Sequence, residues 1–383
     1  MTGELWEVHM DDASMRETTI TEERPVLNRT LAAETYTDPA RFDQELRSVF
    51  PQHWLLACRI DDVPETGATA RTVAGRPLLL TRRGVSVGAF HNVCSHRGSL
   101  VVGDTVEGER LRCIYHGWTY GLDGALTSVP RESRFERLDR QACGLPEIAA
   151  ESWGGWIWVR LGEGPSFDEW LGPWRAELSR YRTERQQRWA ERVDELELNW
   201  KAAVDAFNET YHVAFVHPET VGRLVDGAAS SFRYGGPHSR MVIPIRRAET
   251  APAAHGDVGE ETGGEQRKEL LPEQRRDHCN YTLFPNVVLN LLSTWGICLV
   301  FEPVDVSRTR LHTTMIVDPP ETEARGRLYD TQWQQFSKVL EEDLESLDLV
   351  GQGMRSPAFR QARFGGEEER LAHFHDQVAE AMS

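Results

Sequence analysis

Residues 94–118 read CSHRGSLVVGDTVEGERLRCIYHGW and carry one cysteine and one histidine near each end. Cys94 and His96 have one residue between them, and two residues separate Cys113 from His116. Zinc fingers take their ligands as a cysteine pair and a histidine pair, whereas each half of this stretch offers one of each. That mixed pairing favours a [2Fe–2S] cluster in which the two thiolates bind one iron and the two imidazoles bind the other.

The composition describes a globular protein with an acidic surface. The chain has 383 residues, 40% of them hydrophobic, with 43 basic and 60 acidic side chains and a formal net charge of −17. That charge argues against nucleic acid or an anionic membrane as a partner. Six cysteines are too few for a disulfide framework. No apolar run is long enough to span a membrane and the N-terminus lacks a signal-peptide pattern, so we expect a cytoplasmic protein.

The first part of the chain predicts a small β domain behind an N-terminal arm. We expect residues 1–44 to form a loosely ordered arm followed by a helix that begins near Thr37 or Asp38. Short apolar runs separated by turn residues predict an all-β domain over residues 45–160. These runs are ARTVAG, PLLLTRR, VSVGAFHN, LRCIYHG, GALTSV and GGWIWVRL.

Residues 161–383 predict an α+β domain with an antiparallel sheet. Apolar residues recur at helical spacing in FDEWLGPWRAELSRYRTERQ and NWKAAVDAFNETYHVAFVHP, and a closing helix of about twenty-five residues is expected to end at Gly351 and Gly353. Strands are expected in YTLFPNVVLNLLSTWGICLVFEPV and RTRLHTTMIVDP. The polar, glycine-rich segment 248–279 is expected to be a long mobile loop or lid.

The segment 199–218 carries a second set of metal-binding side chains. On a continuous helix Asp205, Glu209 and His212 follow at spacings of four and three, so they would share one face. His217 lies five residues beyond His212, and Pro218 should loosen the helix so that the second imidazole can turn back. Two histidines and one carboxylate are the preferred ligands of a non-haem ferrous ion that activates dioxygen.

These segments resemble the Rieske non-haem iron oxygenases over roughly residues 30–355. CSHRG, CIYHGWTYGLDGAL and WGGWIWV are similar to Rieske domains, and NWKAAVDAFNETYHVAFVHP is similar to the family's catalytic motif. The resemblance implies an N-terminal all-β Rieske [2Fe–2S] domain followed by a helix-grip (START/Bet v1-like) catalytic domain. It also implies that Gly98, Gly117 and Gly121 allow the cluster loops to turn tightly.

The resemblance places the third iron ligand on the C-terminal helix. Asp343 is the best match, Glu342 the fallback and Asp348 a third choice. It further implies that Glu209 takes part in catalysis by hydrogen-bonding His212 and a cluster histidine of the neighbouring subunit. Asp205 would then have a supporting or structural role.

The implied function is that of an α, or terminal oxygenase, subunit with a [2Fe–2S] cluster and a mononuclear Fe(II). Electrons would come from an NAD(P)H-dependent reductase, directly or through a ferredoxin, and O2 would hydroxylate or oxidatively demethylate a small organic substrate. The relatives most similar in appearance are the glycine betaine, choline and carnitine monooxygenases. Subunits are expected to form a head-to-tail homotrimer, with added β subunits as the alternative.

Three other functions remain open at this point: a cis-dihydroxylating aromatic-ring dioxygenase, a Rieske-type electron carrier and a metal-stabilised binding module.

A quaternary amine would need an aromatic cage. The candidate cage residues, each of which is also a candidate core residue, are Phe215, Phe232, Tyr234, Tyr281, Phe284 and Trp295.

Overall fold

The computed structural model describes residues 29–246 and 266–383. Its first elements tie the two ends of the chain together. Strand β1 (Arg29–Ala32) pairs antiparallel with β19 (Gln361–Phe364), and α1 (Glu34–Thr37) and α2 (Pro39–Gln52) follow. Asp38 accepts a hydrogen bond from the Ala40 amide at 2.9 Å and caps α2, so the expected helix start is confirmed. The expected arm at residues 1–28 lies outside the described residues.

The N-terminal β domain is an antiparallel sheet in the order β2-β11-β10-β5-β4-β3-β6 with a smaller sheet β7-β8-β9 beside it. The bounds are β2 Leu55–Arg59, β3 Thr66–Val73, β4 Arg76–Arg83, β5 Ser86–His91, β6 Thr105–Glu107, β7 Arg110–Arg112, β8 Thr119–Gly121, β9 Leu126–Ser128, β10 Glu147–Trp153 and β11 Trp156–Arg160. One cysteine–histidine pair follows β5 and the other lies between β7 and β8. The all-β expectation is therefore confirmed.

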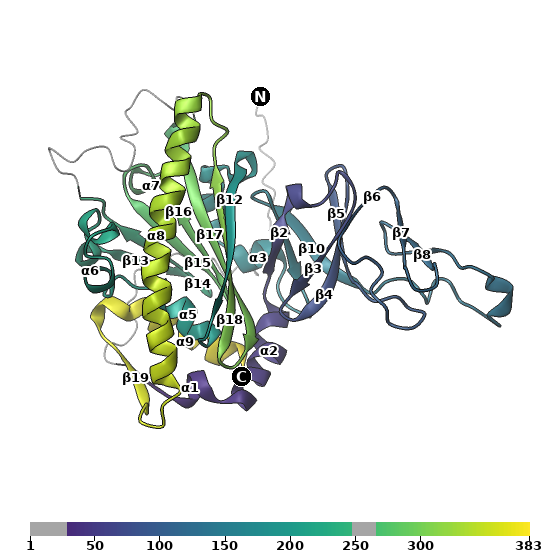
Figure 1. The fold of residues 1–383 in the computed structure, drawn as a ribbon, viewed down its shortest axis with the longest axis horizontal. Helices are drawn as coiled ribbons and strands as arrows, with labels where there is room; N and C mark the ends of the chain where they lie inside the picture. The colour runs from purple at the N-terminus through teal and green to yellow at the C-terminus, as the bar shows by residue number, and fades with distance from the viewer. Residues whose placement is uncertain (1–28, 247–265) are drawn as a thin grey trace, which may run out of the picture.

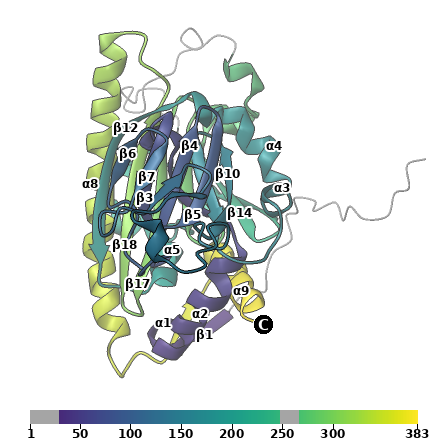
Figure 2. The same ribbon diagram turned by 90° about the vertical axis from the view of Figure 1, so that its right-hand side faces the viewer.

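The C-terminal domain is built on a second antiparallel sheet in the order β12-β18-β17-β16-β15-β14-β13. The strands are β12 Gln187–Leu196, β13 Ser231–Gly235, β14 His238–Ile243, β15 His278–Leu283, β16 Val287–Leu291, β17 Trp295–Asp305 and β18 Arg308–Val317. Helix α8 (Glu323–Met354) runs along one face of this sheet, while α3 (Phe167–Leu171) and α4 (Trp174–Leu178) lie on the opposite side (Figures 1 and 2). This is the expected helix-grip arrangement.

The strands sort their side chains between the two faces. On β15, Cys279 and Tyr281 belong to an apolar cluster that also contains Trp158, Trp170 and Trp174. Asn280, which lies between them in sequence, lines a cavity on the face covered by α8. The period of two along a strand therefore places core and cavity on opposite sides of one sheet.

The segment 199–218 is not the continuous helix that the spacing predicted. It forms α5 (Trp200–Ala206) and α6 (Val213–Val216), and the residues between them are not helical. The expected shared face of Asp205, Glu209 and His212 is therefore wrong. Asp205 instead accepts a hydrogen bond from the Tyr36 hydroxyl at 2.8 Å, because tertiary contacts override the local spacing.

Two further expectations need correction. Helix α8 has 32 residues and continues through Gly351 to Met354. A Cβ at Gly351 would lie 2.2 Å from the Glu197 carbonyl oxygen, so this glycine permits close packing of the helix on its neighbour instead of ending it. Of the expected loop 248–279, the described part holds the short helix α7 (Pro272–Arg276) and the first residues of β15, and the rest lies outside the described residues.

Within the described ranges no helix is both long enough and apolar enough to cross a lipid bilayer. The remaining short helix, α9 (Glu369–Ala381), lies at the C-terminus and contacts α2.

Candidate metal centres

The two cysteine–histidine loops have the same backbone geometry. The Gly98 amide donates to the Cys94 carbonyl at 2.9 Å, and the Gly117 amide donates to the Cys113 carbonyl at 2.9 Å. Gly98 has φ 73° and Gly117 φ 77°, values that side chains with a Cβ rarely adopt. Gly121 was expected to share this role but is the last residue of β8 and is not among the glycines with positive φ.

The two thiols are buried in these loops. Cys94 is 4% exposed and Cys113 is 2% exposed. The Tyr120 hydroxyl lies 3.3 Å from Cys94 Sγ and also accepts a hydrogen bond from the Ser95 amide at 3.1 Å. Burial raises the pKa of Cys113, but hydrogen bonds from the backbone of Tyr115 and other neighbours outweigh it, so the pKa lies below its usual value. The loop therefore favours the thiolate form of Cys113.

The two imidazoles of these loops face each other. The His96 and His116 ring centroids are 4.5 Å apart, and Trp118 stacks on His96 at 5.0 Å with an interplanar angle of 7°. His96 Nδ1 is buried and makes no hydrogen bond to any residue in the described part of the chain. Desolvation and the neighbouring His116 and Arg97 lower the pKa of His96, which favours the neutral ring. A buried, unpaired nitrogen lone pair fits a metal ligand, so the residues present fit a [2Fe–2S] cluster.

The second set of side chains converges in the C-terminal domain. His217 Nε2 lies 2.8 Å from Asp343 Oδ1, and His212 Nε2 lies 3.6 Å from the same oxygen. One donor atom from each of the three residues lies within 4.8 Å of the others. Two nitrogens and one carboxylate oxygen at such separation fit a mononuclear iron with open positions.

The structure separates the three acids that the sequence left as candidates for the third ligand. Glu342 Oε2 lies 2.8 Å from His217 Nδ1, on the opposite side of the ring from Asp343, and accepts a hydrogen bond from Thr220 at 2.6 Å. Burial raises the pKa of Glu342, but its bonds with Thr220 and His217 lower it below the usual value. Asp348 instead accepts a hydrogen bond from Gln352 at 2.8 Å on the exposed part of the helix.

Glu209 lies behind the first histidine. Its Oε1 contacts His212 Nδ1, and its Oε2 accepts a hydrogen bond from the His212 amide at 3.1 Å. The Glu209 side chain is 9% exposed, whereas nearby Tyr211 and Phe215 are 56% and 72% exposed. The carboxylate therefore fixes the His212 ring beside an apolar surface patch.

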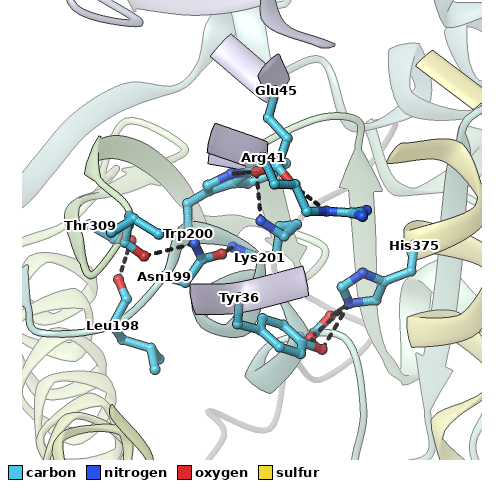
Figure 3. Close-up of polar contacts among 11 residues, drawn as sticks. Tyr36, Arg41, Glu45, Leu198, Asn199, Trp200, Lys201, Thr309 and His375 are labelled. Carbon is cyan, nitrogen blue, oxygen red and sulfur yellow. Dashed lines mark hydrogen bonds and ion pairs between the residues drawn. The ribbon is translucent and has the colours of Figure 1, made fainter. Parts of the chain in front are cut away.

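Buried polar contacts anchor helix α5, which leads into this site (Figure 3). The Asn199 side chain accepts a hydrogen bond from the Lys201 amide at 3.1 Å and caps the helix. Lys201 Nζ and Trp200 Nε1 donate to Glu45 Oε2 of α2 at 2.6 and 2.9 Å. Burial lowers the pKa of Lys201 to about 8, while Glu45 opposes that shift. A charge pair this deep positions α5 against α2.

Sequence reasoning missed a second anchor at the other end of α5. His375 of α9, to which the sequence pattern assigned no role, lies with Nε2 2.9 Å from Asp205 and 3.1 Å from the Tyr36 hydroxyl. Tyr36 and His375 also appear in Figure 3. Burial and the neighbouring Asp205 raise the pKa of Tyr36, so its hydroxyl remains a donor. Tyr36 and His375 lie 169 and 170 positions away from Asp205 in the sequence, so no local pattern could indicate this contact.

A cavity of about 450 Å³ adjoins the two histidines and Asp343. Its apolar lining includes Val213, Leu224, Val225, Met241, Ile243, Leu292, Trp295, Phe336 and Val339. Its polar lining includes Asn280, Asn290, Gln332 and Gln335. The side chains of His212, His217 and Asp343 therefore open onto a largely apolar cavity of a size suited to a small organic molecule.

The proposed aromatic cage is not assembled from the six candidate residues. Trp295 lines the cavity, but Tyr281 and Phe284 are fully buried in the apolar core, and Phe215 is 72% exposed. Tyr234 is buried and donates to Glu369 at 3.0 Å, and Phe232 lines a different hollow beside β14. Most of these rings point away from the cavity because of the face of the strand or the position of the helix that carries them. The sequence pattern did not resolve either feature.

The two candidate centres lie far apart within one chain. In Figure 1 the β7–β8 hairpin, which flanks one pair of candidate cluster ligands, lies toward the right-hand end of the longest axis. Helix α6, between His212 and His217, lies at the opposite end. Direct electron transfer within the chain would have to cross the whole molecule.

Comparison with known proteins agrees with this geometry. Residues 53–146 match the Rieske [2Fe–2S] domain, and residues 177–383 match the ring hydroxylating alpha subunit (catalytic domain). The second match covers more than half of the chain, which therefore belongs to the ring-hydroxylating α-subunit family of Rieske non-haem iron oxygenases. The protein is accordingly an oxidoreductase that uses O2 and carries a Rieske cluster and a mononuclear iron.

Relatives include both monooxygenases and dioxygenases. The large oxygenase component of the naphthalene 1,2-dioxygenase system of Pseudomonas aeruginosa is 27% identical, covering 83% of this chain and 78% of that protein. The glycine betaine monooxygenase oxygenase subunit of Pseudomonas aeruginosa (strain UCBPP-PA14) is 32% identical over 50% of this chain and 45% of that protein. A solved quaternary ammonium Rieske monooxygenase is 20% identical with a TM-score of 0.78, covering 92% and 95% of the two chains, and so shares the fold.

Proposed function

We propose that this α subunit hydroxylates or oxidatively demethylates a small organic substrate at an iron held by His212, His217 and Asp343. The cluster ligands in this proposal are Cys94, His96, Cys113 and His116. The observation that carries the proposal is the convergence of two imidazoles and one carboxylate at the mouth of an apolar cavity. The proposal keeps domain bounds of 1–44, 45–160 and 161–383; the second bound is supported because β11 ends at Arg160 and α3 begins at Phe167, whereas residue 44 lies inside α2.

The ligands are oriented by carboxylates on their far sides. When bound, the Rieske cluster supplies single electrons and the ferrous ion activates dioxygen. Glu209 accepts the Nδ1 proton of His212, and Glu342 accepts the Nδ1 proton of His217. Each contact leaves Nε2 deprotonated and aimed at Asp343. The apolar cavity walls keep water from the site and hold the substrate beside it.

A head-to-tail homotrimer brings one subunit's cluster beside the next subunit's iron. Leu100, Ile114 and Tyr115, around the cluster loops, are 45%, 93% and 55% exposed. Tyr211 and Phe215, next to Glu209, are also exposed. These two apolar patches lie at opposite ends of the molecule, which fits a contact between successive subunits. In this assembly Glu209 bridges His212 and a cluster histidine of the neighbouring subunit.

The electron donor in this proposal is an NAD(P)H-dependent reductase, directly or through a ferredoxin, in the cytoplasm. The relatives named for choline and glycine betaine support monooxygenation of a methylated amine, while the naphthalene dioxygenase component supports cis-dihydroxylation of an aromatic ring as the second candidate. The apolar cavity walls suit an aromatic hydrocarbon, so we keep cis-dihydroxylation as the second candidate.

The test is an iron and sulfide count on anaerobically purified protein, followed by oxygen uptake with a reductase and NADH. One cluster and one iron require three iron atoms and two acid-labile sulfides per chain. We expect substrate-dependent oxygen uptake that disappears in His212→Ala, with the cluster retained. Zinc in the Cys94 site, or turnover that survives loss of the mononuclear iron, would overturn the proposal.

A further inference from the structure

Arg370 of α9 is a buried cation whose hydrogen-bond partners are all neutral. It is 0% exposed and donates to Ser239 Oγ at 3.1 Å, to Asn280 Oδ1 at 2.9 Å and to Thr282 Oγ1 at 2.7 Å. Among residues 29–246 and 266–383 it forms no ion pair. Burial lowers the pKa of Arg370 to about 9, with Tyr234 opposing that shift, so the guanidinium stays protonated at neutral pH.

This guanidinium dictates the orientation of the Asn280 amide. Arginine can only donate, so the oxygen of Asn280 must face it. The nitrogen of Asn280 then donates to the Phe207 carbonyl at 3.1 Å and to Asn290 Oδ1 at 2.7 Å. The Phe207 carbonyl can only accept, so it independently requires the same orientation.

The orientation of Asn280 in turn fixes that of Asn290. Asn280 and Asn290 are directly opposite each other on β15 and β16, and both line the cavity. Because Asn290 Oδ1 receives the Asn280 N–H, the amide nitrogen of Asn290 is left as the end of the chain of donors. Asn290 is 8% exposed and lines the cavity. The order Arg370, Asn280, Asn290 forms a chain of hydrogen bonds with a positive charge at its buried end.

We propose that Asn290 is a specificity-determining residue that donates a hydrogen bond to an acceptor oxygen of the substrate, with a carboxylate preferred over a neutral carbonyl. This deepens the proposed function and rests on it, because it assigns a substrate class to the cavity beside the iron. Donors polarised by a neighbouring cation bind anionic acceptors more strongly than neutral donors do.

The rest of the cavity sets the shape of that substrate. The cavity lining is predominantly apolar although it also includes Lys338 and Arg223, so the substrate has an apolar body that ends in the oxygen. A purely hydrocarbon ligand would leave the Asn290 N–H groups desolvated and unpaired, which costs binding free energy. A bare ammonium group placed there would face a donor chain that begins at a cation.

Arg370 itself is unsuited to the test because it has a second role. Its bond to Thr282 directs the Thr282 hydroxyl toward the side-chain oxygen of Asn208. Asn208 immediately precedes Glu209, so removing Arg370 would disturb the Glu209 region as well as the cavity. Asn290 lies at the other end of the chain and can be changed alone.

The first experiment needs no variant. Isothermal titration calorimetry on the holoenzyme compares benzoate, toluene and benzyltrimethylammonium, which share one ring and differ in the polar group. We expect benzoate to bind at least about tenfold more tightly than toluene, the effect of one charge-assisted hydrogen bond, and the ammonium probe to bind weakest. Equal affinities for benzoate and toluene, or tightest binding of the ammonium probe, would overturn the inference.

Two variants then assign the preference to Asn290. Asn290→Leu should reduce the benzoate-to-toluene ratio about tenfold, while Asn280 keeps its bond to Phe207. Asn290→Asp keeps the acceptor for Asn280 but presents a carboxylate to the cavity, so it should exclude benzoate and favour benzyltrimethylammonium. Gln334→Leu changes an exposed amide of α8 outside the cavity and should leave the ratio unchanged. A ratio unaltered in both Asn290 variants would contradict the assignment.

Iron and sulfide are counted in each sample. If the metal content is full but benzoate binds no more tightly than toluene, this inference is refuted and the proposed function is left intact. Failure to bind the mononuclear iron refutes the proposed function instead.

Discussion

Glu342 and Asp343 are consecutive residues of α8, yet they contact opposite nitrogens of one imidazole. Glu342 lies 2.8 Å from His217 Nδ1, and Asp343 lies 2.8 Å from His217 Nε2. The imidazole of His217 therefore lies between the two carboxylates. We therefore propose Asp343 as the metal ligand and Glu342 as the residue that orients His217.

Because the two acids are proposed to have different roles, substitutions of Asp343 and Glu342 should have different effects. Asp343→Ala should lose the mononuclear iron and keep the cluster, whereas Glu342→Gln should weaken iron binding by about 10- to 100-fold, the usual effect of removing an orienting partner. The ratio of iron to acid-labile sulfide after dialysis against a chelator measures both. Asp348→Asn is the control, and equal iron loss in all three variants would refute the assignment.

Glu209 is expected to act on electron transfer more than on iron content. Glu209→Ala should retain cluster and iron but slow reoxidation of the reduced cluster by O2 and substrate about 10- to 100-fold, because His212 loses its orienting carboxylate and the proposed link to the next subunit is lost. Stopped-flow absorbance of the cluster in a single turnover measures this rate. A variant that reoxidises at the normal rate would remove Glu209 from the path.

Tyr120 should raise the reduction potential of the cluster. Its hydroxyl lies 3.3 Å from Cys94 Sγ and can stabilise the extra negative charge of the reduced state. Tyr120→Phe should lower the midpoint potential by about 60 mV, which corresponds to a tenfold change in a one-electron equilibrium. Redox titration followed by EPR gives the value. Tyr115→Phe, which removes a hydroxyl from a 55% exposed ring, should leave the potential close to that of the unmodified protein.

Charge at the apolar patch near the cluster should prevent assembly. Ile114 is 93% exposed, and Ile114→Asp would bury a carboxylate in the proposed subunit contact, which costs several kcal/mol without a partner, roughly 3 or more. Light scattering after gel filtration should show a trimer for the unmodified protein and monomers for the variant. Val85→Asp, at a residue that is 91% exposed on the β4–β5 turn, should remain trimeric.

Buried His238 should make stability fall in acid. Its Nε2 donates to the Trp170 carbonyl at 2.7 Å and its Nδ1 accepts from the Phe284 amide at 3.0 Å, so the native ring is neutral. Burial lowers its pKa from 6.5 to about 3. The unfolded chain binds a proton that the native state does not, so this contribution is full above pH 6.5 and is lost as the pH falls toward 3.

Urea unfolding at several pH values between 4 and 7 tests this expectation. His238 alone should contribute a slope of up to about 1.4 kcal/mol per pH unit. His238→Gln keeps one donor and one acceptor but does not titrate, and its stability should decline less steeply in acid. Parallel slopes for the two proteins would show that His238 does not titrate on unfolding in this range.

The sequence alone was sufficient to identify the candidate ligands that lie close together in the chain. The two cysteine–histidine pairs, their loop glycines Gly98 and Gly117, and the loosening of the backbone near His217 follow from local spacing and from residue types that restrict the backbone. Alternating apolar runs likewise predicted the β domain. Only the resemblance to a known family pointed to Asp343, because no local pattern distinguishes it from Glu342.

Tertiary structure decided everything that joins distant segments. It ended α5 at Ala206 and turned Asp205 toward Tyr36 and His375, although the spacing favoured one continuous helix. It also placed Arg370, Asn280 and Asn290 in one chain of hydrogen bonds, in which Arg370 and Asn280 are 90 residues apart in the sequence. Spacing constrains only neighbours on the same helix or strand, whereas the direction of a buried side chain depends on which strands and helices pack around it.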